Sequence, residues 1–216
     1  MNDSAGTGSI AKPRLAASVI LLRDGAAGLE VFVQHRVSTM DFAAEMVVFP
    51  GGRVDEIDRR GWDYAEELLT SHAHAWRRSS LAGTQDAGML IAAALREVFE
   101  EAGIQLEAGS LLPWANWITP PDQPKRFDTF FFLAVPDRDV EPQHLTTEAS
   151  ASLWMPVSDI LEQEAAQTLK LMPPTFVLLG ELAELGSVDA VLSLEREIIP
   201  VKAAAGALQE FLKRRR

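Results

Sequence analysis

The sequence predicts an α+β protein, an α/β/α sandwich in which a mixed β-sheet is flanked by helices. Two observations carry this prediction. Short runs rich in β-branched and aromatic residues, at 15–23, 29–36 and 127–135, have the length and composition of strands. Between them, residues 86–102 place apolar side chains at helical spacing, which is typical of a helix that covers one face of a sheet.

The N-terminal elements are expected to be a polar leader and a hairpin. Residues 1–12 are small and polar, which predicts disorder. The runs 15–23 and 29–36 flank the turn-forming sequence Asp-Gly-Ala-Ala-Gly at 24–28. We therefore expect them to pair as antiparallel strands.

The next segment is expected to hold a loop, a short strand and a turn. Residues 38–45 predict the loop, and the apolar residues 46–49 predict the strand. The pair Gly51-Gly52 then predicts a turn, because glycine permits positive φ and a close backbone approach to a ligand. Residues 59–88 are polar and helix-prone.

The central segment is expected to hold the main helix and a buried strand. The helix predicted at 86–102 ends at Gly103, which stands where a helix-stopping glycine is expected. Residues 113–124 contain four prolines and two tryptophans, which predicts a loop that contributes to specificity. The consecutive phenylalanines Phe130, Phe131 and Phe132 within 127–135 predict a buried strand.

Residues 13–216 are expected to form a single domain, because a chain of 216 residues is long enough for one substantial core and short for two. Its C-terminal helices are expected over about 174–216. The remaining elements expected are a strand at 153–157, a helix that starts at Ser158 or Asp159, a helix at 175–185 after Pro173-Pro174, and an amphipathic helix at 203–216.

The composition excludes several kinds of site and partner. The chain has no cysteine, which excludes disulfides, thiolate metal sites and a cysteine nucleophile. Its formal net charge of −11 argues against a broad nucleic-acid-binding surface. No apolar run reaches the roughly 20 residues that span a bilayer, and the N-terminus lacks the apolar stretch of a signal peptide. We therefore expect no membrane partner and a cytoplasmic location.

The most informative segment runs from Arg96 to Ile104, Arg-Glu-Val-Phe-Glu-Glu-Ala-Gly-Ile. Glu97, Glu100 and Glu101 stand three and four residues apart, so their carboxylates gather on one side of a helix. Like charges at this spacing repel one another, and a bound cation would offset the repulsion. Clusters of oxygen ligands favour Mg²⁺ or Mn²⁺. The alternative is a solvated acidic face.

This segment resembles the second half of the Nudix box, Arg-Glu-U-x-Glu-Glu-x-Gly-U, in which U is a bulky aliphatic residue. The opening glycine of the box resembles Gly52, which follows Phe49-Pro50-Gly51. Two features depart from the pattern. Asp58 stands where the family has Glu, and about 30 more residues separate the two halves than the box requires.

An interrupted box of this kind is similar to that of the peroxisomal-type coenzyme A diphosphatases. The resemblance covers roughly residues 14–200. It implies a Nudix fold with a helical insertion inside the box, which we expect to pack as a cap or as part of a dimer contact. The further segments that resemble this branch are Trp114-Ala115-Asn116-Trp117-Ile118-Thr119-Pro120, Arg126-Phe127-Asp128-Thr129 and Pro173-Pro174-Thr175.

The resemblance implies that Glu97, Glu100, Glu101 and Arg96 form the catalytic site and that Mg²⁺ or Mn²⁺ is its cofactor. Glu100 and Glu101 are implied as the principal metal ligands. Glu97 is implied either as a further ligand or as the base that takes the proton of the attacking water. A main-chain group of Gly52 is expected in the metal shell, and Gly51 and Gly52 are expected to let the backbone approach the substrate, a plain turn being the alternative.

Four further residues complete the predicted site. Arg96 is expected to pair with Asp58 or another carboxylate of the box and to orient the catalytic helix rather than to contact phosphate. Glu148 is the candidate for an additional acidic metal ligand, with an exposed loop glutamate as the alternative. Arg36 and Arg126 are candidates for binding a phosphate group, and a surface ion pair is the alternative for Arg36.

The resemblance implies a hydrolase that cleaves a diphosphate bond in a small nucleotide substrate. Coenzyme A or an acyl-coenzyme A is the favoured substrate, with ADP-ribose or NADH as alternatives. A different class of function is a non-catalytic, nucleotide-sensing Nudix-like module, which the presence of all three glutamates disfavours. Dimers are common in the family, so a homodimer is among the expected states.

Overall fold

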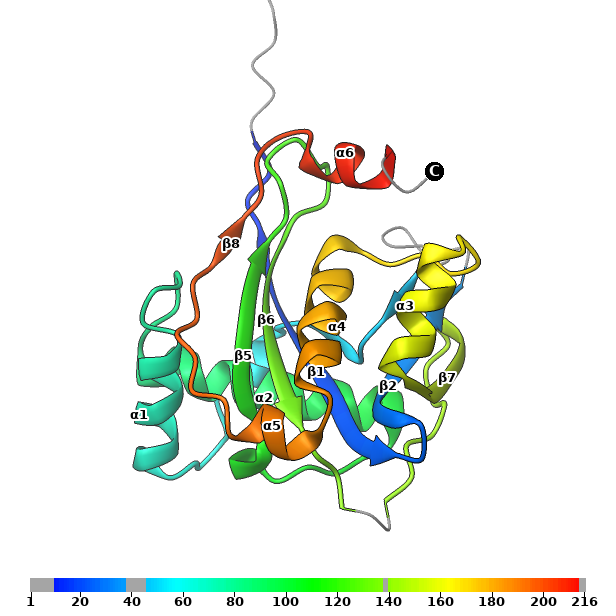
Figure 1. The fold of residues 1–216 in the computed structure, drawn as a ribbon. Coiled ribbons are helices and arrows are strands. Elements are labelled where there is room, and N and C mark those ends of the chain that lie inside the picture. The colour runs from blue at the N-terminus through cyan, green and yellow to red at the C-terminus, as the bar shows by residue number, and fades with distance from the viewer. Residues whose placement is uncertain (1–9, 38–45, 138–139, 214–216) are drawn as a thin grey trace, which may run out of the picture.

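A computed structural model describes residues 10–37, 46–137 and 140–213 (Figure 1). The elements in chain order are β1 (Arg14–Gly25), β2 (Gly28–Arg36), β3 (Val47–Val48), β4 (Gly51–Arg53), the 3₁₀ helix η1 (Glu56–Arg59), α1 (Glu66–Ala75), α2 (Thr84–Ala102), the 3₁₀ helix η2 (Ala108–Ser110), β5 (Leu112–Ile118), β6 (Phe127–Ala134), β7 (Ala149–Pro156), α3 (Val157–Ala165), α4 (Pro173–Leu185), α5 (Val188–Leu192), β8 (Val201–Lys202) and α6 (Ala207–Lys213).

The strands form one mixed sheet around β1. The order is β3-β2-β1-β6-β5-β8, with β4 paired to β1 and β7 paired to β2. The predicted hairpin is confirmed, since β1 and β2 pair antiparallel up to Gly25 and Gly28. The other long partner of β1 is β6, which runs parallel to it from the Arg14–Phe127 pair to the Leu21–Ala134 pair.

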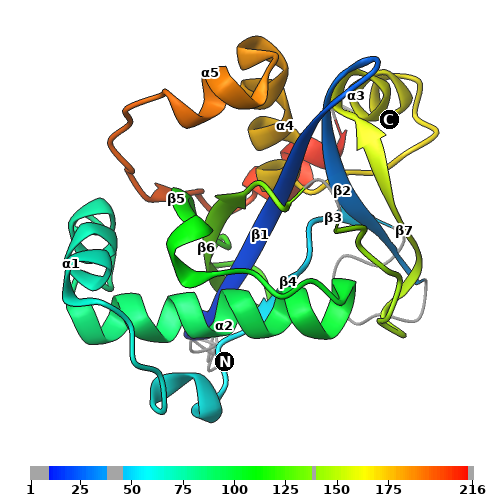
Figure 2. The ribbon, with the colours of Figure 1, turned by 90° about the horizontal axis from the view of Figure 1, so that it is seen from below.

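Helices cover both faces of the sheet, which confirms the predicted sandwich. Along β1, Val19 and Leu21 pack into the core beneath α2, whereas Ile20 and Leu22 pack into the core beneath α3 and α4. This alternation follows from the two-residue period of a strand whose two faces are both buried. Figure 2 shows α1 and α2 on one side of β1 and α3, α4 and α5 on the other.

The predicted helix-prone stretch contains α1, which contributes to the core as well as covering it. His72 and Trp76 are both buried, and Trp76 stands edge-on to Phe130 and Phe132 with ring centroids 5.0 and 5.4 Å away. Burial lowers the pKa of His72 to about 4, so this side chain is neutral in the folded protein. The segment therefore packs on the same core as α2.

Several predicted elements need correction. The loop expected at 113–124 is wrong in its first half, because 112–118 form strand β5, which pairs with β6, whereas 119–126 do connect the two strands as a loop. A register shift between Pro113 and Ala115 lets the strand accommodate a proline that has no N–H to donate. β7 starts earlier than the predicted 153–157, and α5 and β8 were not predicted.

Other expectations fall outside the described residues or are refined. The loop predicted at 38–45 and most of the polar leader lie outside the described part of the chain. Within the described residues the last helix covers Ala207–Lys213, so it starts later than the predicted residue 203. Among the helices that the structure describes, none has both the length and the apolar character needed to cross a bilayer.

Candidate active site

The three glutamates lie in the last two turns of α2. This helix ends at Gly103, whose φ of 68° is left-handed and whose N–H donates to the carbonyl of Phe99 (3.0 Å). The C-terminal end of a helix carries partial negative charge, which disfavours nearby carboxylates. Glu97, Glu100 and Glu101 are therefore placed where an additional cation would stabilise the fold.

The glycine pair lies in strand β4 rather than in the predicted turn, and β4 reaches the glutamates. The Gly51 N–H donates to Oε2 of Glu101 at 2.9 Å. The Glu97 carboxylate packs against Gly52, where a Cβ atom would stand 2.5 Å from Oε1 of Glu97. Ser18 on β1, which the sequence did not single out, donates its hydroxyl to the Pro50 carbonyl (3.0 Å) and so fixes the start of β4.

Replacing Gly51 by Ala is expected to destabilise the fold and displace Glu101. Its φ is 152°, and an added Cβ would stand 2.5 Å from the Ala17 carbonyl oxygen, which is backbone and cannot rotate away. Backbone strain and overpacking together predict a loss of about 2–5 kcal/mol of unfolding free energy, measured by urea denaturation. Gly109→Ala is the matched control, since a Cβ there meets nothing within 4 Å. Equal stability of the two variants would contradict this account.

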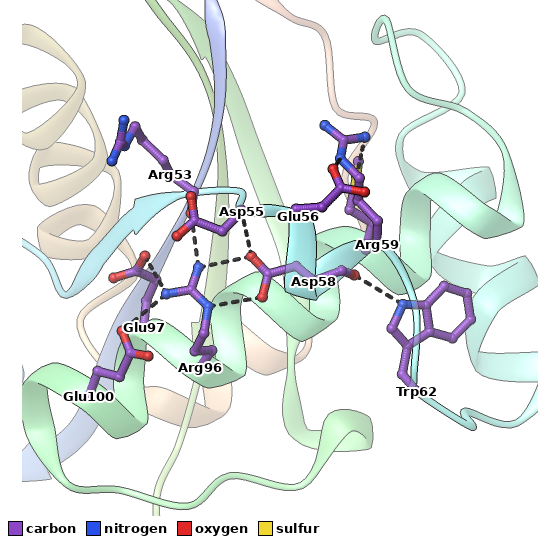
Figure 3. A network of polar contacts seen from close by, with 10 residues as sticks. Arg53, Asp55, Glu56, Asp58, Arg59, Trp62, Arg96, Glu97 and Glu100 are labelled. Carbon is purple, nitrogen blue, oxygen red and sulfur yellow. Dashed lines mark hydrogen bonds and ion pairs between the residues drawn. The ribbon is translucent and has the colours of Figure 1, made fainter.

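Arg96 is the centre of a polar network that ties α2 to the segment after β4 (Figure 3). Its Nε and Nη2 donate to both carboxylate oxygens of Asp58, at 2.9 and 2.8 Å, and Nη2 also donates to the Arg53 carbonyl at 2.9 Å. Its Nη1 donates to Glu97 at 2.9 Å and to Glu100 at 3.0 Å. The predicted pairing with Asp58 is present, although the Asp58 side chain is one methylene group shorter than that of the family's Glu.

Asp58 joins this network from a buried position. It is 3 % exposed, and one of its carboxylate oxygens also accepts the Asp55 N–H at 2.7 Å. Hydrogen bonds with Asp58 raise the pKa of Arg96 further above its usual value. Arg96 therefore remains charged, and its planar guanidinium fixes three carboxylates at once.

Glu97 and Glu101 are carboxylates whose charged forms are disfavoured by burial. Burial raises the pKa of Glu101 to about 7, and the nearby charges of Glu97 and Glu148 act in the same direction, while the Gly51 N–H and Arg36 oppose them. Burial also raises the pKa of Glu97, against the opposing effect of Arg96. Glu101 makes no ion pair within the described residues.

Arg36 and Glu148 form an ion pair beside Glu101. Nη2 of Arg36 lies 3.0 Å from Oε2 of Glu148. The Glu148 carbonyl accepts the Val37 N–H at 3.0 Å, which holds the start of β7 against the end of β2. The Glu148 charge raises the pKa of Glu101 and the Arg36 charge lowers it. The segment before Glu148 is held to the end of α2, since the Leu145 N–H donates to the Glu101 carbonyl at 3.2 Å. The structure thus places these two predicted residues at the end of α2.

Arg126 is placed elsewhere. It donates to the main-chain carbonyls of Thr119 at 3.0 Å and Ala11 at 2.7 Å, and neither contact involves the α2 carboxylates. Trp114, in the segment predicted as a specificity loop, is fully buried with the Arg196 guanidinium 4.2 Å above its ring. Arg126 therefore links the segments next to β5 and β1, and Trp114 belongs to the hydrophobic core.

The chemistry of the donor set suits the implied metal ion. All side-chain donors are carboxylate oxygens, which suits Mg²⁺ or Mn²⁺. The buried Glu101 carboxylate accepts a backbone N–H and makes no ion pair with the described residues, which also favours a cation. As they stand, however, no three acidic or histidine side chains of the described segments converge closely enough to hold a metal ion. The Arg96 guanidinium contacts both Glu97 and Glu100, so these side chains would turn toward a bound ion.

Comparisons with known proteins give a family and a fold. The profile described as "NUDIX domain" matches residues 65–175, which is half of the chain. The crystal structure of a NUDIX hydrolase from Alicyclobacillus acidocaldarius is 28 % identical, with a TM-score of 0.71, and covers 88 % of this chain and 99 % of that one. The NUDIX domain of Shewanella oneidensis NrtR, complexed with ADP ribose, is 15 % identical with a TM-score of 0.53 over 81 % of this chain and 88 % of that one, which shows the fold alone.

Two curated relatives are also similar. Nudix hydrolase 7 of Caenorhabditis elegans is 28 % identical over 188 residues, which are 82 % of this chain and 62 % of that protein. An acyl-coenzyme A diphosphatase of Gallus gallus is 27 % identical over 160 residues, which are 70 % of this chain and 40 % of that protein. The chain therefore spans less than two thirds of either relative.

Proposed function

Because this chain belongs to the Nudix family, we propose that it is a hydrolase that cleaves the diphosphate bond of coenzyme A or an acyl-coenzyme A with the help of a divalent cation. The observation that carries the proposal is the meeting of Glu97 and Glu101 with the glycine strand β4, despite the interruption of the box. The acyl-coenzyme A substrate is supported by the interrupted box and by the similarity to the diphosphatase of Gallus gallus.

Mg²⁺ or Mn²⁺ would be held by Glu97, Glu100 and Glu101, with a main-chain group of Gly52 and the Glu148 carboxylate as further ligands. When bound, the cation would neutralise the charge of the diphosphate and polarise its phosphoryl oxygens. Nudix hydrolases generally use divalent ions. The charge balance of this site also favours a cation, because its carboxylates outnumber the guanidinium groups of Arg36 and Arg96. The five carboxylates are those of Asp58, Glu97, Glu100, Glu101 and Glu148.

The side chains of the site divide the remaining work. A carboxylate whose pKa is raised toward neutrality can take a proton from the attacking water near pH 7, and burial raises the pKa of both Glu97 and Glu101. The water oxygen bonds to phosphorus as the bridging P–O bond breaks. Arg36 is the better placed of the two predicted phosphate-binding arginines, because it lies beside Glu101 whereas Arg126 is bonded to main-chain carbonyls.

A substrate panel tests the proposal. Coenzyme A, acetyl-coenzyme A, ADP-ribose and NADH are compared with Mg²⁺ or Mn²⁺, and products are separated by chromatography. We expect kcat/KM for the two coenzyme A substrates to exceed the others by at least about 10-fold, the discrimination that one lost substrate contact of about 1.4 kcal/mol gives. Glu100→Gln and a chelator should each remove the turnover. Preference for ADP-ribose or NADH would overturn the substrate assignment, and tight nucleotide binding without any turnover would favour the sensing module.

A further inference from the structure

The ribbon formed by β2 and β7 carries three buried N–H donors that have no acceptor within the described residues. They are Nε2 of Gln34, Nε1 of Trp154 and Nε of Arg36. Gln34 is only 3 % exposed. Buried donors are almost always paired in folded proteins, and an unpaired one destabilises the folded state. Three on one ribbon therefore call for an explanation.

The strand register places these donors on one face. Gln34 pairs with Ser152, and Phe32 pairs with Trp154, so all four side chains point the same way. The ring contact between Phe32 and Trp154, at 5.7 Å, confirms the shared side, which is the side covered by α2. Arg36 is two residues beyond Gln34. The donors thus form a row, Arg36, Gln34 and Trp154, that leads away from the α2 carboxylates.

The arginines at the two ends of this row are already paired with glutamates. At one end, Arg36 pairs with Glu148 at 3.0 Å. At the other end, Arg23 lies over the Trp154 ring and pairs with Glu30 at 2.7 Å and with Glu141 at 3.2 Å. Between the ends, the unpaired donors are a neutral amide and a neutral indole. The row is therefore suited to uncharged acceptors such as carbonyl or hydroxyl oxygens, and not to a second phosphate.

The segment 141–148 lies along the same row. Its Leu145 N–H donates to the Glu101 carbonyl at 3.2 Å, and His144 Nδ1 lies 2.8 Å from the Ser152 hydroxyl. The segment thus connects the end of the catalytic helix with the ribbon. A ligand that extends from the diphosphate along the row would have to displace part of this segment to reach the buried Gln34 and Trp154 N–H groups.

We propose that the row of Arg36, Gln34 and Trp154 binds the uncharged, amide-bearing arm of the substrate, whose carbonyl and hydroxyl oxygens accept the Gln34 and Trp154 N–H groups. This inference rests on the proposed function, because it takes the diphosphate to lie at the α2 carboxylates. It deepens that function by assigning the specificity for a coenzyme A-type substrate to Gln34 and Trp154. In ADP-ribose the corresponding arm is a sugar without amides.

Two substitutions and a matched control test the assignment by kinetics. Gln34→Met removes a donor with little change of shape, and Trp154→Phe removes a donor together with one ring of the indole. Trp76→Phe makes the same change at another buried indole N–H without an acceptor among the described residues, at the C-terminal end of α1. We expect each of the first two to raise KM for coenzyme A by about 10-fold, the factor that corresponds to one lost hydrogen bond, with a smaller change in kcat. Trp76→Phe should leave KM unchanged. Unchanged KM in Gln34→Met together with a higher Tm would show that the unpaired donor is only a packing defect, and would overturn the inference.

A binding measurement separates this inference from the proposed function. Pantetheine, which is the uncharged arm without phosphate or nucleotide, is titrated into the ¹⁵N-labelled wild-type protein. The chain has five tryptophans, and their indole N–H signals are assigned from single Trp→Phe variants. The Trp154 signal should shift with pantetheine while the Trp76 signal stays in place. A shift without turnover on any nucleotide would reject the proposed function and retain the arm-binding row, whereas turnover of coenzyme A without a shift would reject the row alone.

Discussion

Glu101→Gln is expected to abolish turnover while making the metal-free protein more stable at neutral pH. The substitution keeps an oxygen that can accept the Gly51 N–H, now 2.9 Å from the carboxylate, but removes the negative charge that a cation requires. Loss of an essential acid–base or metal-binding carboxylate lowers kcat by about 10²–10⁴. The increase in stability has a separate cause, which is the burial of the charge.

The direction of the pH dependence follows from the shifted pKa. Burial raises the pKa of Glu101 to about 7 from 4.5, so the folded state binds this proton more tightly than the unfolded chain does. The wild-type protein therefore loses stability as pH rises from about 4.5 through about 7, and the glutamine variant does not. The difference in unfolding free energy should approach about 3 kcal/mol at pH 8 and vanish near pH 4.

Urea denaturation in the presence of a chelator, at pH 4, 6 and 8, measures this difference. Glu107→Gln is the control, because Glu107 is an exposed carboxylate outside the site. With Mn²⁺ added, the order should reverse, since ligand binding to the folded state raises the Tm of the wild type and not of the variant. Identical pH profiles for wild type and variant would show that the Glu101 carboxylate is not destabilised by burial.

Arg96→Ala is expected to give the largest loss of stability. The guanidinium is shared by Asp58, Glu97, Glu100 and the Arg53 carbonyl, and its removal leaves Asp58 as a buried charge without a cation. Breaking a buried ion pair from one side costs about 3–5 kcal/mol, which corresponds to a fall in Tm of about 6–20 °C for a domain of this size. Differential scanning calorimetry measures the change.

Arg59→Ala is the matched control for that loss. Arg59 also lies next to this network, but its ion pair with Glu56, at 3.3 Å, is between exposed side chains three residues apart. Exposed pairs of this kind contribute at most about 1 kcal/mol. Arg96→Lys should fall between the two, because an ammonium group keeps the charge but cannot donate to both oxygens of Asp58 and to the two glutamates together. A Tm for Arg96→Ala within a degree of that for Arg59→Ala would show that the network does not stabilise the fold.

The predictable parts of the site are those whose residues lie close together in the sequence. The spacing of Glu97, Glu100 and Glu101 fixes their side of α2, and Gly103 ends the helix, so both could be inferred from helical geometry. The Arg96–Asp58 contact spans 38 residues but was implied by the Nudix resemblance. The hairpin of β1 and β2 was also predictable from a local signal, because its turn-forming residues directly follow β1 and directly precede β2.

The parts that were missed depend on contacts between distant segments. Gly51 was expected in a turn and lies in β4, because its conformation is set by pairing with Ser18 on β1. The prolines of 113–124 favoured a loop, yet residues 112–118 pair with β6 and form a strand. A bulge in this strand accommodates Pro113. The closeness of Arg36 and Glu148 to Glu101 could not be deduced either, since it arises from the pairing of β2 with β7.

The parallel pairing of β1 with β6 has a consequence for how the chain is made in the cell. β1 ends at Gly25 and β6 at Ala134, so a ribosome must add roughly 110 further residues before the first strand meets its long partner. At about 5–20 residues per second, that interval lasts about 5–20 s. During it, the nascent apolar strand has β2 as a neighbour but lacks its other long neighbour. Translation speed and chaperone supply should therefore influence the yield of this protein more than that of a domain built from sequential hairpins.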